Sequence, residues 1–297
     1  MGRIVTAPRL LSSGRPPLLR KTVRSISRKE TNNIINTHHT LQKKRQQALA
    51  RNDANEAAAL AAEISALGGI EEYQKASLQG QKKDRGGDSS RVLLEWLRAV
   101  KLPRTKRKYE EGEIDGLQRL RMLEVGALST ENACSKSGLF DMEHIDLNSQ
   151  QPGILQQDFM ERPLPNDDTE RFDIISLSLV INYVPDHALR GQMLLRTLSF
   201  LRQPADDVAD DARELLPAVF LVLPRSCIQN SRYFSEARLD ELMAIFGYIR
   251  KDCKITNKQA YSLWNRTSPP RHPLPALAKK ELNPGLKRNN FTITLRP

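Results

Sequence analysis

Short hydrophobic runs alternate with polar segments from residue 121 to residue 223. Five runs share this character, and they cover residues 121–125, 143–147, 155–159, 172–179 and 218–223. Short apolar runs bounded by polar spacers of helix length predict buried parallel strands joined by crossover helices. Nearer the end of the chain, residues 248–255 and 291–295 are predicted as antiparallel strands, with a short strand at 260–264. The pattern indicates an α/β protein with a mostly parallel sheet.

In the segments before and between these strands, apolar residues recur at the spacing of a helix. This spacing predicts a helical hairpin at residues 34–68 and further helices at 70–81, 92–100, 186–201 and 235–246. Asp53 or Asn55 can cap the second helix of the hairpin. Leu93, Trp96 and Leu97 share one face of their helix. The N-terminal part of the chain is therefore predicted to be a helical extension of the sheet domain.

A single glycine, Gly126, follows the first predicted strand, and Asp146 ends the second strand twenty residues later. This is the usual layout of a nucleoside site, in which the glycine admits the ligand to the backbone and the acid binds ribose hydroxyls. A dinucleotide fold needs G-x-G-x-x-G for its pyrophosphate, but this turn has one glycine and brings in an acid, Glu131. NAD and FAD are therefore disfavoured.

S-adenosyl-L-methionine has no phosphate, and it needs acids for its ribose and for its cationic amino group. Glu124, two residues before Gly126, is placed for the amino group, and its alternative is a solvated surface acid. Asp158, after the third strand, would face the adenine amino group, and its alternative is an ordinary loop acid. The pattern predicts a class I, Rossmann-like methyltransferase fold with a mostly parallel, seven-stranded sheet.

The segment after the fourth strand carries the candidate catalytic residues, Asn182 and Tyr183. Class I methyltransferases that act on nucleobases place their target pocket here. An amide can hydrogen-bond the edge of a base, and an aromatic ring can stack on its face. The alternative is a loop asparagine beside a core tyrosine.

The net charge of +11 is concentrated at the two ends of the chain. Residues 1–50 carry +10 and residues 266–297 carry +6, whereas the residues between them carry −5. Basic arms suit a polyanion, and RNA is the obvious one. The alternatives for the N-terminal arm are a solubilising tail, a nuclear-import signal or a mitochondrial transit peptide, although its prolines interrupt any long amphipathic helix.

The three cysteines, Cys134, Cys227 and Cys253, are far apart and form no C-x-x-C motif. We therefore expect a reduced intracellular compartment, with neither a disulfide framework nor a metal site. No apolar run approaches the ~20 residues of a membrane span. We expect no membrane partner.

Several strings in the chain, taken together, resemble one family. They are RGGDSS, EWL, LEVGAL, HIDLNS, QQDF, FDIISLSLVINYVP and LPRSCIQNSRYF. In this order they resemble the fungal 25S ribosomal RNA adenine-N1 methyltransferases, over residues 31–294. The resemblance implies methylation of an adenine N1 in large-subunit ribosomal RNA. It also implies cofactor contacts at Gly126 and Asp146.

Composition and periodicity set the expected organisation. Residues 1–32 are expected to be a basic disordered tail, residues 33–108 a helical cap with a basic linker, and residues 109–297 the methyltransferase domain with a mobile basic loop at 265–290. The expected partner is ribosomal RNA or the pre-ribosome, in the nucleolus of the nucleus, and the expected state is a monomer. A related animal branch senses S-adenosylmethionine, so a non-catalytic sensor acting through a protein partner is the alternative.

Overall fold

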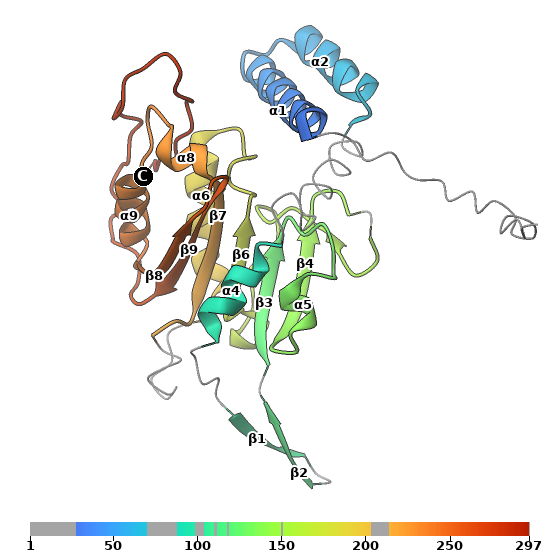
Figure 1. Cartoon of the computed structure of the whole chain (residues 1–297), viewed down its shortest axis with the longest axis vertical. Coiled ribbons are helices and arrows are strands. Elements are labelled where there is room, and N and C mark those ends of the chain that lie inside the picture. The colour runs from blue at the N-terminus through green and yellow to red at the C-terminus, as the bar shows by residue number, and fades with distance from the viewer. Residues whose placement is uncertain are drawn as a thin grey trace, which may run out of the picture.

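The computed structural model describes residues 28–69, 88–98, 104–109, 112–117, 119–149, 151–202 and 214–296. Its centre is one seven-stranded sheet with the order β5-β4-β3-β6-β7-β9-β8 (Figure 1). The strands are β3 Leu120–Val125, β4 Phe140–Asp146, β5 Leu155–Gln156, β6 Ile174–Ser178, β7 Ala218–Pro224, β8 Tyr248–Ile255 and β9 Gln259–Arg266. Only β9 runs against its neighbours; the other pairs are parallel. The predicted α/β class and mostly parallel seven-stranded sheet are confirmed.

The strand order contains one point at which the direction of winding reverses. From β3 the chain steps outward to β4 and β5, and it then returns to place β6 on the other side of β3. In open α/β sheets, ligands bind in the crevice outside the carboxyl ends of the strands at such a switch point. The switch point here lies between β3 and β6, so this rule places a ligand between the residues that follow β3 and those that follow β6, and we call this position the crevice.

Alternate residues of β3 face opposite sides of the sheet, as the two-residue period of a strand requires. Leu123 and Val125 belong to a core shared with the helices α6, His187–Phe200, and α9, Glu236–Ile245. Met122 belongs to a second core with Leu93 and Leu97 of α4, Ser90–Leu97. Both faces of the sheet are therefore covered.

The early crossovers lack the long helices that the spacing predicts. The first contains only the four-residue helix α5, Ala133–Lys136, and the third only a short 3-10 helix, Asp168–Glu170. Between β4 and β5, the described residues contain no helix. The helix α4, from the N-terminal extension, covers the face of the sheet that a crossover helix would otherwise cover.

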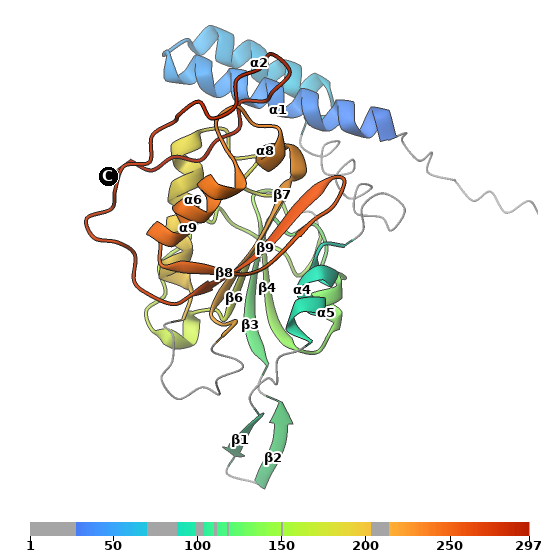
Figure 2. The ribbon, with the colours of Figure 1, turned by 60° about the vertical axis from the view of Figure 1, so that its left-hand side comes forward.

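The predicted helical hairpin is present, as α1, Arg28–Ala50, and α2, Ala54–Ala66. Asp53 caps α2, and its carboxylate accepts the amide of Glu56 at 2.9 Å. The two helices pack on each other and lie beyond the carboxyl ends of the strands (Figures 1 and 2). Residues 1–27 of the predicted basic tail and the helix predicted at 70–81 lie outside the described residues. The tail was predicted to extend to residue 32, but residues 28–32 belong to α1.

Three segments differ from the sequence-based expectation. The expected linker before the core contains a β-hairpin of β1, Arg104–Tyr109, and β2, Gly112–Leu117, whose register sets Lys106 opposite Asp115. The expected basic loop begins later than residue 265, because β9 continues to Arg266. Residues 291–295 are not a strand of the sheet: the hairpin of β8 and β9 completes it, and Leu295 makes only an isolated bridge with Leu277.

Candidate functional site

The structure brings Gly126 and Asp146 together at the switch point. Because β3 and β4 are parallel with Val125 opposite Ile145, the two residues leave neighbouring strands at the same edge. The amide of Gly126 donates to the carbonyl of Ile145 at 2.8 Å, and the amide of Ala127 donates to the same oxygen at 3.0 Å. The predicted glycine and carboxylate therefore lie side by side, half-buried at the mouth of the crevice.

Gly126 has two structural reasons to be glycine. Its φ of +75° lies in the left-handed region, which side chains disfavour. A Cβ at this position would also lie 2.7 Å from Cγ2 of Val180, in the segment that follows β6. The glycine thus allows the two loops on either side of the switch point to approach each other. Any substitution there would alter the backbone as well as the space for a ligand.

The backbone is also strained on the β6 side of the crevice. Leu179 has a φ of +58°, and its amide is held by the carbonyl of Val222 at 2.9 Å. A non-glycine residue in this region costs of order 1–3 kcal/mol, and such residues gather at functional sites. The turn at Leu179 sends the chain directly into the loop that holds Asn182 and Tyr183.

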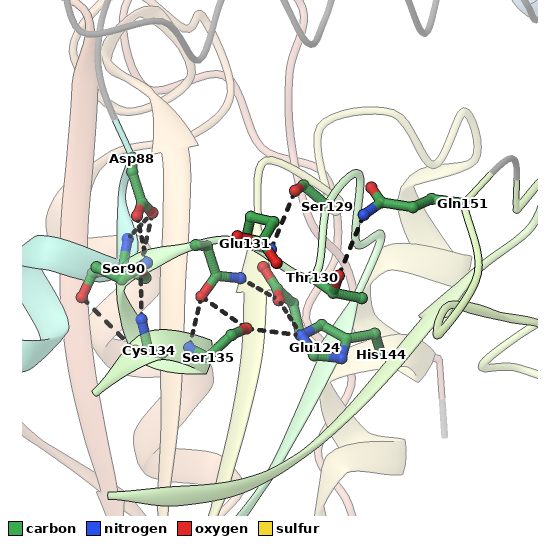
Figure 3. A network of polar contacts seen from close by, with 12 residues as sticks. Asp88, Ser90, Glu124, Ser129, Thr130, Glu131, Cys134, Ser135, His144 and Gln151 are labelled. Carbon is green, nitrogen blue, oxygen red and sulfur yellow. Dashed lines mark hydrogen bonds and ion pairs between the residues drawn. The ribbon is translucent and has the colours of Figure 1, made fainter. Parts of the chain in front are cut away.

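A network of polar contacts joins the starts of α4 and α5 to β3 and β4 (Figure 3). The Asp88 carboxylate accepts the amide of Ser90, in α4, at 2.9 Å and the amide of Ala133, in α5, at 2.6 Å. Ser90 Oγ also donates to Asp88 at 2.6 Å and accepts the amide of Cys134 at 3.2 Å. One carboxylate therefore holds the starts of two helices together. Ser89 extends the contact across the crevice, because its Oγ lies 2.8 Å from Oγ of Ser178 at the end of β6.

Glu124 lies at the centre of this network, with its side chain 17% exposed. Asn132 Nδ2 donates to Glu124 Oε2 at 2.6 Å, and His144 Nε2 lies 3.4 Å from the same oxygen. Burial is the main cause that raises the pKa of Glu124 to about 7, with a smaller contribution from the charge of Asp88. Burial lowers the pKa of His144, so this imidazole is neutral at pH 7 and its Nε2 also meets Ser135 Oγ at 3.0 Å. Glu124 is therefore poised to gain or lose its charge near neutral pH.

Asp146 and Asp158 follow two neighbouring strands at one edge, because Asp146 pairs with Gln156. Each is half-buried, and each uses one carboxylate oxygen in its own turn. Asp146 Oδ1 accepts the amide of Asn148 at 2.8 Å, and Asp158 Oδ1 accepts the amide of Met160 at 2.7 Å. A carboxylate has acceptor capacity beyond one such bond, which hydroxyl or amino groups of a nucleoside can use.

Asn182 and Tyr183 stand on the β6 side of the crevice, in a loop that continues into α6. Oδ1 of Asn182 is buried and has no hydrogen-bond partner among the described residues. Buried polar atoms are nearly always paired, so an orphan acceptor in this loop suits a ligand that donates a hydrogen bond. Tyr183 is half-buried, and its amide donates to the carbonyl of Val180 at 2.9 Å.

Sequence reasoning missed the partners of Glu124. Asn132 looks like an ordinary helix cap, and it does cap α5 by accepting the amide of Ser135 at 2.9 Å. The only sequence signal for His144 was its place two residues before Asp146, which puts both on one face of β4. Both residues are recognisable as part of the site only once the chain is folded.

Other reactive side chains belong to the scaffold. Burial raises the pKa of Cys227 to about 12, so its thiolate does not form near neutral pH. Nδ1 of His187 lies 2.8 Å from Oγ1 of Thr294. No group of three or more potential metal ligands occurs among the described residues. Over the same part of the chain, no helix is long and apolar enough to span a bilayer.

The doubly wound sheet, its single antiparallel strand and the carboxylates at its switch point define a class I methyltransferase fold with a nucleoside-type site. The family model described as "25S rRNA (adenine(2142)-N(1))-methyltransferase, Bmt2" matches residues 58–293. This chain belongs to that family.

Two curated relatives carry corresponding names. The 25S rRNA (adenine(2142)-N(1))-methyltransferase of Saccharomyces cerevisiae is 36% identical over 234 residues, which cover 78% of this chain and 62% of the relative. The 25S rRNA adenine-N(1) methyltransferase of Schizosaccharomyces pombe is 36% identical over 263 residues, covering 88% of this chain and 90% of the relative. The chain thus spans less than two thirds of the first relative and most of the second.

Among solved structures, the 16S rRNA methylase RmtB is similar, with a TM-score of 0.41 and 11% identity. The match covers 80% of this chain and 98% of that one.

Proposed function

We propose that this protein transfers a methyl group from S-adenosyl-L-methionine to N1 of an adenine in 25S, large-subunit, ribosomal RNA. Membership of the family and the names of both yeast relatives support this substrate. The observation that carries the proposal in the structure is the arrangement at the switch point. Carboxylates lie on the β3–β4 side of the crevice, and an unpaired buried amide oxygen lies on the β6 side.

The residues on the first side suit the adenosyl group of the cofactor. Asp146 would accept hydrogen bonds from the ribose hydroxyls, and Asp158 from the adenine amino group. Glu124 would face the cationic amino group, because it is the buried carboxylate between α5 and β4. The loop at Gly126 supplies the close approach of backbone. The cofactor, when bound, supplies the electrophilic methyl group.

Asn182 and Tyr183 suit the target base. The edge of adenine that carries N1 also carries the 6-amino group, which donates hydrogen bonds. The orphan Oδ1 of Asn182 can accept one of them while the N1 lone pair stays free to attack. Tyr183 would stack on the face of the base. N1 is nucleophilic at neutral pH, so placement in line with the methyl group can supply roughly 7–11 kcal/mol without a general base.

N1 is occupied by pairing in a duplex, so the adenine must be unpaired or flipped out before transfer. The basic ends of the chain would bind the RNA backbone, with an affinity that falls as salt rises. Action on the pre-ribosome in the nucleolus, as a monomer, is part of the same proposal.

The test is a methyl-transfer assay with purified protein, labelled S-adenosyl-L-methionine and 25S rRNA fragments, followed by nucleoside analysis. We expect 1-methyladenosine as the product. Asn182→Ala should lower kcat by about tenfold or more, because one hydrogen bond to the reacting base is lost. Asn166→Ala, at an exposed asparagine in the loop before β6, is the matched control. Cofactor binding without any methylated nucleoside would instead favour the sensor.

A further inference from the structure

We propose that residues 279–290 form a basic finger that docks on RNA beside the target adenine. The inference rests on the proposed function and adds the surface through which the RNA is held. The finger lies in the C-terminal segment that follows β9 (Figure 2, red-brown). It packs on the helix α8, Arg225–Gln229, and on residues 230–233. The helix α8 begins directly after β7, at the edge of the sheet where the site is proposed.

Backbone hydrogen bonds fix both arms of the finger. On the outgoing arm, the amides of Leu282 and Asn283 donate to the carbonyl of Arg232 at 2.9 and 3.1 Å. On the returning arm, the amide of Arg232 donates to the carbonyl of Asn289 at 2.9 Å. The amide of Asn289 donates to Asn230 at 3.0 Å. These bonds fasten this part of the predicted basic loop to the domain.

The side chain of Arg232 holds the tip of the finger by hydrogen bonds. Its guanidinium donates to the carbonyl of Gly285 at 2.8 Å and to Oδ1 of Asn290 at 3.1 Å. The same group lies 3.8 Å from the carboxylate of Glu281, the one acid of the finger. A loop held in one conformation before binding loses less entropy when a partner docks.

The finger presents a leucine among lysines. Leu286, at the tip, is 100% exposed, and Lys279, Lys280 and Lys287 of the same finger are also exposed. Nζ of Lys279 lies 4.1 Å from the centre of the Tyr233 ring, so this lysine is partly ordered by a cation–π contact. Burial of this side chain by a docked partner would be favourable, because its apolar surface would leave water.

The root of the finger is tied to the loop proposed to bind the base. Arg190, in α6, donates from Nε to the carbonyl of Val184 at 2.7 Å and from NH1 to the carbonyl of Thr292 at 2.7 Å. Its guanidinium also lies 4.5 Å from the ring centre of Phe291. Val184 directly follows Tyr183 in the chain. Phe291 and Thr292 are the first two residues after the finger. One half-buried arginine therefore links the root of the finger to the loop proposed to bind the base.

The chemistry of this surface favours RNA as the occupant. Four basic residues stand against one acid, and Arg232 already engages that acid. Lysines beside an apolar tip match phosphates beside an unstacked base, where proteins insert leucine and similar wedges. A protein interface of this kind would present a wider apolar patch, whereas the finger exposes Leu286 and, at 37%, Leu282.

The experiment uses the full chain and a 25S rRNA hairpin that carries the target adenine. Leu286→Ala should raise the KM for this RNA about tenfold, in line with burial of one leucine side chain. Lys280→Gln with Lys287→Gln should weaken RNA binding and flatten its dependence on salt by about 0.7–0.9 per lysine removed. Leu164→Ala, at a leucine 58% exposed before β6, and Lys251→Gln, on β8, are the matched controls.

The readouts separate the two proposals. An unchanged RNA KM and unchanged RNA binding in the finger variants, with methylation intact, would overturn the finger and leave the enzyme standing. RNA binding that needs the finger, in a protein that never methylates, would overturn the enzyme and leave the finger standing. Normal binding to naked RNA with lost binding to pre-ribosomal particles would mean that the finger docks on protein, and would also overturn this assignment. Cofactor affinity should be the same in all variants.

Discussion

Asp146 offers the cleanest test of the cofactor site at the scale of single residues. Asp146→Asn keeps Oδ1, and with it the bond from the amide of Asn148 at 2.8 Å, but removes the charge. Hydrogen bonds to a charged group are worth about 1.5–3 kcal/mol, so cofactor affinity should fall by about 10- to 100-fold. Calorimetry with S-adenosylhomocysteine measures it. Asp141→Asn, on the same strand with its side chain 62% exposed, is the control; equal affinities in both variants would remove Asp146 from the site.

Glu124 should make the stability of the protein depend on pH in an unusual direction. Its pKa is about 7 in the folded chain, against an ordinary value of 4.5. The folded state therefore binds the proton more tightly than the unfolded state. This contribution to stability is complete below about pH 4.5 and is lost as pH rises through 7. Between pH 5 and pH 8.5 the wild type should therefore lose up to about 3 kcal/mol of unfolding free energy through this group. Glu124→Gln, which keeps an acceptor for Asn132, should not show this loss.

Urea unfolding at both pH values measures this difference. Glu131→Gln is the control, because the Glu131 side chain is 67% exposed and its ion pair with Lys136 is on the surface. Identical pH profiles for wild type and Glu124→Gln would show that Glu124 keeps an ordinary pKa.

The same group should set the pH dependence of cofactor binding. An ionised Glu124 attracts an ammonium group, and a protonated one does not. Affinity for S-adenosylhomocysteine should therefore rise between pH 6 and pH 8 in the wild type, and much less in Glu124→Gln. Titration calorimetry at the two pH values decides it. A pH dependence that survives the substitution would place the cofactor's amino group elsewhere.

The residues that follow strand ends were predictable, and the environment of Glu124 was not. Gly126 and Asp146 fall at the ends of apolar runs, and parallel strands bring such ends together. The pKa of Glu124 depends instead mainly on its burial, and then on Asn132 and Asp88, which come from separate segments and meet Glu124 only in the folded chain. No local pattern in the sequence encodes that meeting.

At the scale of elements, α4 replaces a crossover helix. Leu93 is completely buried against the sheet, and Trp96 meets the ring of Phe220 edge-on at 5.9 Å. The helix that carries Asp88 at its start is thus fixed by the same core that supports β3. Movement of α4 would move the polar network of the site.

Leu93→Ala should therefore destabilise the whole domain. Removal of a fully buried leucine side chain costs about 2–5 kcal/mol, because a cavity remains. Chemical denaturation measures this cost. Leu147→Ala, at a leucine 64% exposed, should change stability by less than about 0.5 kcal/mol. A small effect at Leu93 would mean that α4 is not part of the domain core.

Strands were predictable where the sequence has a short apolar run. The predicted strand at residues 172–179 contains β6, Ile174–Ser178. Residues 291–295 have an equally apolar pattern, but Thr294 bonds to His187 in α6 and Thr292 to Arg190, so the segment packs on the side of the domain. A sequence pattern shows that a segment is buried, but not against which partner it is buried.

At the scale of the whole molecule, the basic residues and the proposed site lie in different parts of the chain. The central residues carry a net −5 and hold the carboxylates of the site, whereas both ends are basic. The helical hairpin of α1 and α2 and the finger, residues 279–290, both lie toward the carboxyl ends of the parallel strands (Figures 1 and 2). RNA bound by the basic segments would therefore lie at the edge of the sheet at which the cofactor site is proposed.

The most direct test of this account is primer extension across 25S rRNA from cells that lack this chain. A methyl group on N1 of adenine blocks base pairing, so wild-type RNA should stop the extension at one adenine. The stop should vanish in the deletion, return with the wild-type gene, and fail to return with Asp146→Asn. A stop that persists in the deletion would contradict the proposed activity.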